Sequence, residues 1–401
     1  MNWKEVRLED CCVSITDGDH QPPPKSDTGI PFITIANINS FNKIDFTSSM
    51  HVPKDYYFNL NGTKRPSKDD ILYSVVGSFG IPVFLKEDIP FVFQRHIALL
   101  RPNKDIIYPK FLYYKMLSRD FYQQADTVAI GAAQRTIGLA SLRKMTIVFP
   151  VSYKDQEKIA NALSAYDDLI ENNQKQIKLL EEAAQRLYKE WFVDLRFPGH
   201  EQTRIVDGVP EGWEKGLLKN IVQFLSGFAF KSESFNIIGK YKIVTIKNVQ
   251  DGHFDGVNVE HIDQIPNSMP KHCYLTEGDM LLSLTGNVGR ICIVVGEGYL
   301  LNQRVAKIQT NFPCYTYCLL KSREMFIKLN NLANGAAQQN LSPVRTESSM
   351  IYIPPLELLQ SFEKIALPMF KRILVLNNEM LRLTEARDRL LPKIMNGEIE
   401  L

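Results

Sequence analysis

Residues 154–191 read KDQEKIANALSAYDDLIENNQKQIKLLEEAAQRLYKEW, and they decide the fold because they carry one heptad pattern in which nine of the ten positions are apolar. Apolar or aromatic residues recur at alternating spacings of four and three, which is typical of a helix in a coiled coil. The positions are Ile159, Leu163, Tyr166, Ile170, Asn173, Ile177, Leu180, Ala184, Leu187 and Trp191. A helix over this stretch would be roughly 57 Å long at 1.5 Å per residue. The one amide among these positions, Asn173, would either set the register of the coiled coil or lie in a frayed turn.

A second heptad pattern lies near the end of the chain. Its positions are Phe362, Ala366, Met369, Ile373, Leu376, Met380, Leu383, Arg387, Leu390 and Ile394, and only Arg387 interrupts it. Proline inside a helix costs about 3 kcal/mol, so Pro368 predicts a kink or a helix that begins near it. Asn396-Gly397 is the expected C-terminal cap of this helix.

Two long amphipathic helices of similar length are natural partners, because neither buries its apolar stripe alone. The connection between them includes a whole domain, so we expect an antiparallel pair within one chain. That pair would place two domains at opposite ends of a rod. The alternatives are that each helix packs on its own domain, or that helices pair between two chains.

The rest of the chain is built twice, with landmarks in the same order. Asp70-Ile71-Leu72-Tyr73-Ser74 matches Asp279-Met280-Leu281-Leu282-Ser283, and each is followed by two glycines at the same spacing. The other matched segments are residues 33–38 with 244–249, Gln94-Arg95 with Gln303-Arg304, 131–134 with 335–338, and 157–160 with 363–366. The segments between the landmarks differ greatly. A repeated scaffold with variable loops is typical of a recognition protein.

We therefore predict an α+β fold with two mixed α/β domains, separated by two long helices that form an antiparallel coiled coil, with an internal pseudo-two-fold repeat. Short β-branched or aromatic runs predict strands at 32–35, 71–76, 83–85 and 145–149. Residues 109–125 predict one helix opened by proline. The expected boundaries are 1–150 for the first domain, 151–198 for the central helix, 199–355 for the second domain and 356–401 for the last helix.

Composition narrows the class of protein. The chain has 401 residues, 47 Lys plus Arg and 45 Asp plus Glu, and a net charge of only +2, which argues against a non-specific nucleic-acid coat. None of the six cysteines forms a CxxC pair, so we expect reduced thiols and no zinc site. The absence of a signal region and of a long apolar run predicts a cytoplasmic protein without a membrane segment. No phosphate-loop, dinucleotide, hydrolase or methyltransferase motif is present, so the chain alone is expected not to be an enzyme.

Polar residues at the landmarks are the candidate recognition groups. Arginine reads guanine and glutamine reads adenine through paired hydrogen bonds, and both also bind phosphate. The same residues would equally serve as hydrogen bonders of the scaffold, or as ordinary solvated surface beside Tyr56-Tyr57 and Lys271-His272. The candidate DNA-binding residues are Lys64, Arg65, Gln94, Arg95, Gln134, Arg135, Arg290, Gln303, Arg304, Gln338 and Gln339.

This ordered combination resembles the specificity subunit of type I restriction–modification enzymes. The resemblance is carried by residues 185–194 (QRLYKEWFVD), by Val209-Pro210-Glu211-Gly212-Trp213 with Trp3 in the same place of the first half, and by residues 390–398 (LLPKIMNGE). It implies that each domain reads one half of an asymmetric, two-part site on double-stranded DNA, and that the coiled coil sets the spacer. It also implies two docked methyltransferase subunits, joined by restriction subunits. S-adenosylmethionine, ATP and Mg²⁺ would belong to those partners.

Two other classes remain open from the sequence. One is a coiled-coil structural adaptor without a DNA role. The other is a nuclease or methyltransferase whose motifs are not recognised, which would be active as the purified chain alone.

Overall fold

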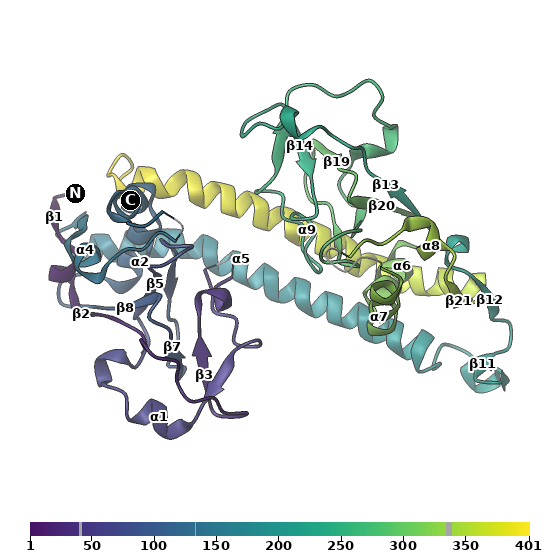
Figure 1. The fold of residues 1–401 in the computed structure, drawn as a ribbon, viewed down its shortest axis with the longest axis horizontal. Coiled ribbons are helices and arrows are strands. Elements are labelled where there is room, and N and C mark those ends of the chain that lie inside the picture. The colour runs from purple at the N-terminus through teal and green to yellow at the C-terminus, as the bar shows by residue number, and fades with distance from the viewer. Residues whose placement is uncertain (40–41, 133, 334–338) are drawn as a thin grey trace. The chain divides into compact units, whose positions relative to one another are not determined.

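The computed structural model describes residues 1–39, 42–132, 134–333 and 339–401. These residues form two compact units. Unit 1 comprises Met1–Leu169 and Leu383–Leu401, and unit 2 comprises Ile170–Arg382. Each unit therefore contains one mixed domain and a part of both long helices (Figure 1).

Unit 1 is built on a four-stranded antiparallel sheet with the order β2-β8-β5-β6. A three-stranded sheet, β4-β3-β7, lies farther from the long helix α5 (Tyr153–Tyr188) than this sheet does, and its β3–β7 pair is parallel (Figure 1). A third pair joins β1 to β9. The bounds are β1 Trp3–Arg7, β2 Cys12–Asp17, β3 Ile30–Ile33, β4 Met50–Val52, β5 Ile71–Ser74, β6 Pro82–Phe84, β7 Val92–Phe93, β8 Ile97–Pro102 and β9 Thr146–Pro150. The four predicted strands are thus confirmed to within about two residues at each end.

The predicted helix over 109–125 is wrong in one respect, because the structure has two helices there. Helix α2 ends at Leu117 and α3 begins at Arg119, with Ser118 in an extended conformation between them. The buried Ser118 hydroxyl donates to the carbonyl of Lys115 at 2.5 Å, so a side chain takes over a helical hydrogen bond. The helices of the unit 1 domain are α1 Lys54–Phe58, α2 Pro109–Leu117, α3 Arg119–Val128 and α4 Leu139–Lys144.

Unit 2 repeats this plan. Its four-stranded sheet has the order β13-β20-β17-β18, and a second sheet, β15-β14-β19-β16, again contains one parallel pair, β14–β19. Strand β12 pairs with β21, as β1 pairs with β9. The bounds are β10 Ile205–Val206, β11 Val209–Pro210, β12 Glu214–Leu217, β13 Val222–Ser226, β14 Tyr241–Val244, β15 Glu260–Ile262, β16 Tyr274–Leu275, β17 Met280–Ser283, β18 Ile291–Ile293, β19 Tyr299–Leu301, β20 Val305–Thr310 and β21 Met350–Ile353, with helices α6 Pro313–Lys321, α7 Arg323–Leu332 and α8 Pro343–Glu347. The predicted internal repeat is confirmed at the level of sheet topology.

The repeated acidic landmark is part of the scaffold in both units. Asp70 accepts a hydrogen bond from the amide of Ser67 and forms an ion pair with Arg101 at 2.8 Å. In unit 2, Asp279 accepts from the amide of Thr276 and pairs with Lys307 at 2.7 Å. Each aspartate thus closes the turn before a central strand and ties it to the neighbouring strand.

The long helices α5 (Tyr153–Tyr188) and α9 (Leu356–Met395) run antiparallel in each unit. In unit 1, Asp167 of α5 meets Arg387 of α9 at 2.6 Å, and the earlier residue Ile159 shares a core with the later residue Ile394.

In unit 2, the Asn173 side chain donates to Glu379 at 3.1 Å. Farther along α5, the ring of Tyr188 contacts that of Phe362, which lies earlier on α9. The antiparallel pairing within one chain is confirmed, and Asn173 is buried rather than frayed. The separation of the two domains along a rod stays a prediction.

The expected helix start near Pro368 is wrong, because α9 begins at Leu356 and continues through the proline as one helix, whereas the expected kink stays a prediction. The apolar residues Ala366 and Ile373 on either side are buried, and this packing holds the helix where one backbone hydrogen bond is missing. The C-terminal cap is confirmed. Gly397 has a φ of +74°, its amide donates to the carbonyl of Ile394 at 3.2 Å, and the next amide donates to Lys393 at 2.9 Å.

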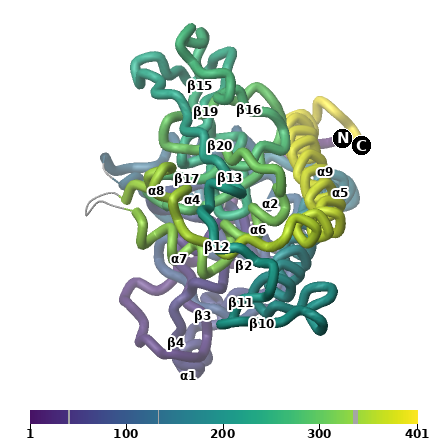
Figure 2. Tube along the Cα trace, turned by 90° about the vertical axis from the view of Figure 1, so that its right-hand side faces the viewer, coloured from purple at the N-terminus to yellow at the C-terminus, as the bar shows by residue number. Residues whose placement is uncertain are grey.

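The two ends of the chain lie side by side in unit 1 (Figure 2). The ammonium group of Met1 is 2.5 Å from the Glu400 carboxylate, and Gly397 lies against the indole ring of Trp3. Among the helices that the structure describes, none has the length and apolar character needed to cross a membrane.

Candidate functional site

Three strands of the main sheet of unit 1 meet at one end of that sheet. Asp17, the last residue of β2, lies opposite Ala98, and Ser74, the last residue of β5, pairs with Ile97 at the start of β8. The loops that leave these strands therefore emerge together. We call this surface, formed by residues 17–20, 75–80 and 94–96, the polar end of unit 1.

The turn of residues 94–96 is clamped by the backbone of the first of these loops. The amide of Asp19 donates to the carbonyl of Phe93 at 3.0 Å, and the amide of Arg95 donates to the carbonyl of Asp19 at 3.1 Å. A Cβ on Gly18 would lie 2.0 Å from the Phe93 oxygen, so only glycine fits at this close approach. The Arg95 side chain is left exposed on a rigid turn.

Further donors gather around the same loop. The Lys64 ammonium donates to the carbonyl of Gly18 at 3.3 Å, and the Tyr56 hydroxyl donates to the Asp19 carboxylate at 2.8 Å. Burial, together with this hydrogen bond, raises the pKa of Tyr56 to about 12, so the phenol keeps its proton at neutral pH. His20 lies 2.7 Å from Asp17. The structure thus joins Lys64 to the predicted site around the turn.

One arginine of the predicted set in unit 1, Arg135, is tied to the scaffold by its side chain. Arg135 hydrogen-bonds to both the carboxylate and the carbonyl of Asp126, and its guanidinium lies over the Phe79 ring, 5.1 Å from the centroid. Arg65 is half-buried, and its backbone carbonyl accepts from Arg101 at 2.8 Å. The side-chain contacts of Arg135 favour a structural role for that residue.

Gln134 lies next to the polar end. Its side-chain nitrogen is 3.6 Å from the position that a Cβ on Gly77 would take, and it is exposed. The neighbouring carbonyl of Arg135 accepts from the amide of Gly77 at 2.9 Å. Gln134 is therefore positioned by the glycine turn that follows β5.

Unit 2 has an equivalent polar end, formed by residues 226–228, 284–289 and 302–304. The amide of Gln303 donates to the carbonyl of Phe228 at 2.9 Å, and a Cβ on Gly227 would lie 2.2 Å from the carbonyl oxygen of Asn302. Gln303 and Arg304 are exposed on this turn. The ring of His272 approaches the carbonyl of Ser226 at 2.9 Å.

The structure corrects the predicted match of Gln94-Arg95 with Gln303-Arg304. In unit 1 the amide of Val75 donates to the carbonyl of His96, whereas in unit 2 the amide of Leu284 donates to the carbonyl of Arg304. Arg304 therefore occupies the place of His96, Gln303 that of Arg95, and Asn302 that of Gln94. The identical letter pairs are one residue out of register, so the two turns present different side chains at each equivalent place.

The remaining predicted residues of unit 2 differ in their surroundings. Arg290 is half-buried just before β18, and its guanidinium donates to the Gln250 side chain at 2.6 Å. Gln339 is exposed, and its carbonyl accepts from the amide of Gly286 at 3.2 Å. Gln338 lies outside the described residues.

Sequence reasoning missed His20, His96 and Asn302 at these two surfaces. The sequence landmarks gave no signal for the shift, because Gly18 and Gly227 stand at the same separation as Asp70 and Asp279, and that separation places Gln303 opposite Gln94. Only the backbone hydrogen bonds place Asn302 there. The side chains gathered at both ends are those that bind base edges and phosphate oxygens.

Comparison with known proteins places the chain in context. A family model described as the type I restriction modification DNA specificity domain matches residues 1–182 and 210–366. The type I restriction enzyme MjaIX specificity subunit of Methanocaldococcus jannaschii is 28% identical over 313 residues, which cover 74% of this chain and 71% of the relative. The HindI specificity subunit of Haemophilus influenzae is 23% identical and is matched over 99% of this chain and all of its own length. The S subunit of a type I restriction–modification system from M. genitalium has the same fold, with a TM-score of 0.56 and 18% identity over 98% of this chain and 96% of that chain.

Proposed function

Because the chain belongs to the family of type I restriction–modification DNA specificity proteins, we propose that its two polar ends read the two halves of one split DNA site. The chain is a specificity subunit, and it acts by recognising DNA sequence rather than by catalysis. The relatives give no support to an adaptor without a DNA role.

The observation that carries the proposal is that the turns at 94–96 and 302–304 have the same backbone hydrogen bonds but different side chains. Both units clamp the turn before a central strand with a glycine that tolerates no Cβ, Gly18 in unit 1 and Gly227 in unit 2. The residues on the turn differ at every equivalent place, as described above. A frame that holds different donors in the same position is suited to reading different bases.

The donor sets predict half-sites of different composition. Arg95 in unit 1 suits guanine, whose O6 and N7 both accept hydrogen bonds, whereas Gln303 at the equivalent place in unit 2 suits adenine. Lys64 and Arg304 reach the surface beside these residues and would contact phosphate oxygens, which position the protein without specifying sequence. The complete site is therefore asymmetric.

Partner subunits complete the activity. Specificity subunits of this type assemble with modification and restriction subunits and bind DNA. We assign two methyltransferase subunits to the repeated scaffold, one for each half. S-adenosylmethionine, ATP and Mg²⁺ then belong to the partners. A small net charge of +2 fits a subunit that shares the phosphate contacts with such partners.

The test exchanges the turns within the full chain. The variant that carries Asn-Gln-Arg at positions 94–96 is assembled with the methyltransferase subunits, and methylated sites are mapped by single-molecule sequencing. We expect the first half-site to change and the second to stay the same. The single variants Arg95→Ala and Gln303→Ala should each weaken specific binding roughly 5- to 150-fold, since one base contact contributes about 1–3 kcal/mol.

The control is Lys178→Ala, which removes one exposed positive charge from α5 without touching either polar end. It should leave both half-sites and the affinity unchanged. If Arg95→Ala altered the second half-site, or if neither turn variant altered specificity, the assignment of one half-site to each polar end would be wrong.

A further inference from the structure

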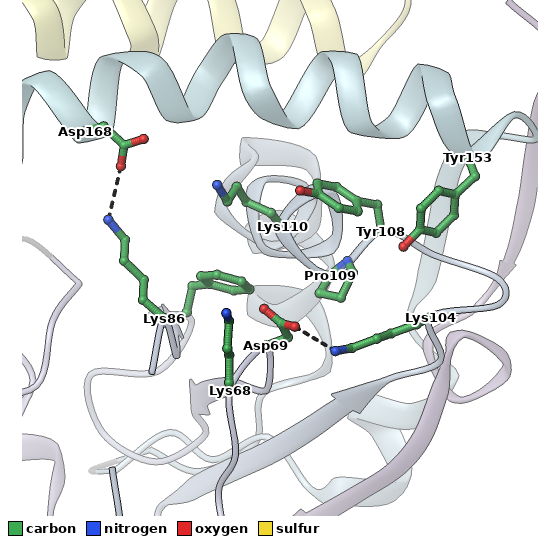
Figure 3. Close-up of a pocket in the computed structure, with 10 residues that line it drawn as sticks. Lys68, Asp69, Lys86, Lys104, Tyr108, Pro109, Lys110, Tyr153 and Asp168 are labelled. Atoms are coloured by element: carbon green, nitrogen blue, oxygen red, sulfur yellow. Dashed lines mark hydrogen bonds and ion pairs between the residues drawn. The ribbon is translucent and has the colours of Figure 1, made fainter. Parts of the chain in front are cut away.

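A cavity of about 440 Å³ lies at the other end of the main sheet of unit 1, away from the polar end. Strand β5 begins there and β8 ends there, as their register shows. Helix α5 and the start of α2 complete the walls. Four lysines and two tyrosines line the cavity, namely Lys68, Lys86, Lys104, Lys110, Tyr108 and Tyr153 (Figure 3).

The cavity carries excess positive charge. Lys104 is neutralised by Asp69 at 2.7 Å, and Lys86 is neutralised by Asp168 at 3.2 Å. Within the described part of the chain, the ammonium groups of Lys68 and Lys110 have no carboxylate within 4.0 Å. Two positive charges in a concave site attract anions more strongly than the same charges on an open surface.

The wall formed by the tyrosines is rigid. Gln156 is fully buried; its side-chain oxygen accepts from the amide of Tyr108 at 2.7 Å, and its nitrogen donates to the carbonyl of Pro150 at 2.9 Å. The rings of Tyr108 and Tyr153 pack edge to face, 5.7 Å apart. Burial raises the pKa of both phenols, so their hydroxyls stay protonated and can donate to a bound oxyanion.

Unit 2 is an internal comparison, since it has the same fold at this place without the lysines. The amide of Leu85 donates to the carbonyl of Asp70, and that of Val294 donates to the carbonyl of Asp279, which fixes the correspondence. The residues in the places of Lys68, Asp69, Lys86 and Lys110 are Glu277, Gly278, Val295 and Cys314. The fold therefore does not need the lysines for its own stability.

Asp69 adds to this contrast. Its φ is +72°, in the left-handed region, where unit 2 has Gly278 with a φ of +90°. A residue other than glycine in this region carries a backbone cost of about 1–3 kcal/mol. Unit 1 accepts this cost at the position whose carboxylate holds Lys104 against the cavity.

We propose that this cavity binds a small ligand that carries two or more phosphate groups. The ammonium groups of Lys68 and Lys110 neutralise the charge, and the tyrosine hydroxyls donate to the remaining phosphoryl oxygens. The volume lies within the range of about 300–1,000 Å³ that is typical of small-molecule sites. The ligand would contact the sheet and α5 of unit 1 together and would stabilise that unit on binding. This site is separate from DNA reading and does not depend on the proposed function.

The test uses the purified full chain and two probes, inorganic tripolyphosphate and ATP, each without added metal. Isothermal titration calorimetry should show saturable binding at one site, which weakens as salt screens the lysines. Lys68→Glu, which installs the residue of unit 2, and Lys110→Ala should each lower the affinity at least tenfold. Lys68→Arg should retain binding and shows that the charge is what matters. Lys144→Ala, an exposed lysine at the end of α4, is the charge-matched control.

Hydrogen exchange distinguishes loss of the site from loss of the fold, because Lys68→Glu should leave exchange of β5 and α5 unchanged without ligand. Tighter binding of ATP than of tripolyphosphate would identify a nucleotide, and equal affinity would identify the phosphate chain alone; both support the proposal. Absence of saturable binding, or binding that Lys68→Glu and Lys110→Ala leave intact, overturns it. The proposal is also overturned if neither tripolyphosphate nor ATP binds at these lysines and only a DNA duplex without the recognition site does.

Discussion

The ion pair between Asp167 and Arg387 allows a sharp test of the helix pairing in unit 1. Arg387 is the one position that interrupts the apolar heptad of α9, and it meets Asp167 of α5 at 2.6 Å. The Tyr114 hydroxyl donates to the other oxygen of the same carboxylate at 2.5 Å. Replacing Arg387 by methionine restores an apolar heptad position but leaves the Asp167 charge without its cation.

The expected loss follows from the burial of the pair. Breaking a fully buried ion pair by removing one partner costs about 3–5 kcal/mol. The side chains of Arg387 and Asp167 are 24% and 21% exposed, so water compensates in part and we expect about 2–3 kcal/mol. The double variant Asp167→Asn with Arg387→Met should recover most of this, because no charge is left unpaired and Tyr114 keeps an acceptor.

Amide hydrogen exchange over residues 159–168, measured by mass spectrometry, reports the stability of this segment. A loss of 2–3 kcal/mol corresponds to exchange that is roughly 30- to 150-fold faster. The control is Lys175→Ala, which removes the exposed lysine of an ion pair with Glu171 on the same helix. Such pairs contribute about 0.3–0.5 kcal/mol, so exchange should change less than about threefold. Exchange in Arg387→Met no faster than in Lys175→Ala, or a double variant as unstable as the sum of the singles, would refute the reasoning.

Three further predictions concern the frame and the helices. Gly227→Ala should displace the turn at Asn302, because the added Cβ would lie 2.2 Å from the Asn302 carbonyl oxygen. In gel-shift titrations we expect at least a tenfold loss of binding to one half-site. An equal loss at both half-sites would contradict the model. Pro368→Ala should stabilise α9 by about 2 kcal/mol, since the exposed proline lacks one backbone hydrogen bond. Amide hydrogen exchange over residues 364–372 should then slow. Faster exchange would show that the proline contributes packing. Insertion of four residues into each long helix should lengthen the accepted spacer by about two base pairs, at 1.5 Å per helical residue and 3.4 Å per base pair. Methylome sequencing measures the spacer. Changed half-sites would contradict a spacer role for the helices.

Much of the candidate site was predictable because it sits on repeated landmarks. The match of Asp70 with Asp279 as equivalent repeat positions, made from the sequence alone, correctly identified the turn before a central strand in each unit. The match of Gln94 with Gln303 was wrong because it rested only on the two residues being identical. Identical letters indicate equivalence only when no residue is gained or lost between landmarks, and here the backbone hydrogen bonds show a shift of one residue.

The role of each charged side chain depended on neighbours that are distant in the sequence. Arg135 looked like a recognition residue until Asp126 and the Phe79 ring were seen to hold it. Arg387 interrupts the apolar heptad in the sequence, and only the structure shows that it forms an ion pair with Asp167 on the other helix. No local pattern predicts such contacts, because the partners are brought together only by the packing of separate elements.

The sequence by itself determined the two long helices, the duplicated domain and the family, because helical periodicity and repeated landmarks are local signals that survive in a single chain. Only the tertiary structure decided which turn residues share a place in the two units, and which lysines meet in one cavity. Lys68 and Lys110 stand on different elements far apart in the chain. Their charges act on one ligand site only because the sheet, α2 and α5 of unit 1 bring them to the same wall.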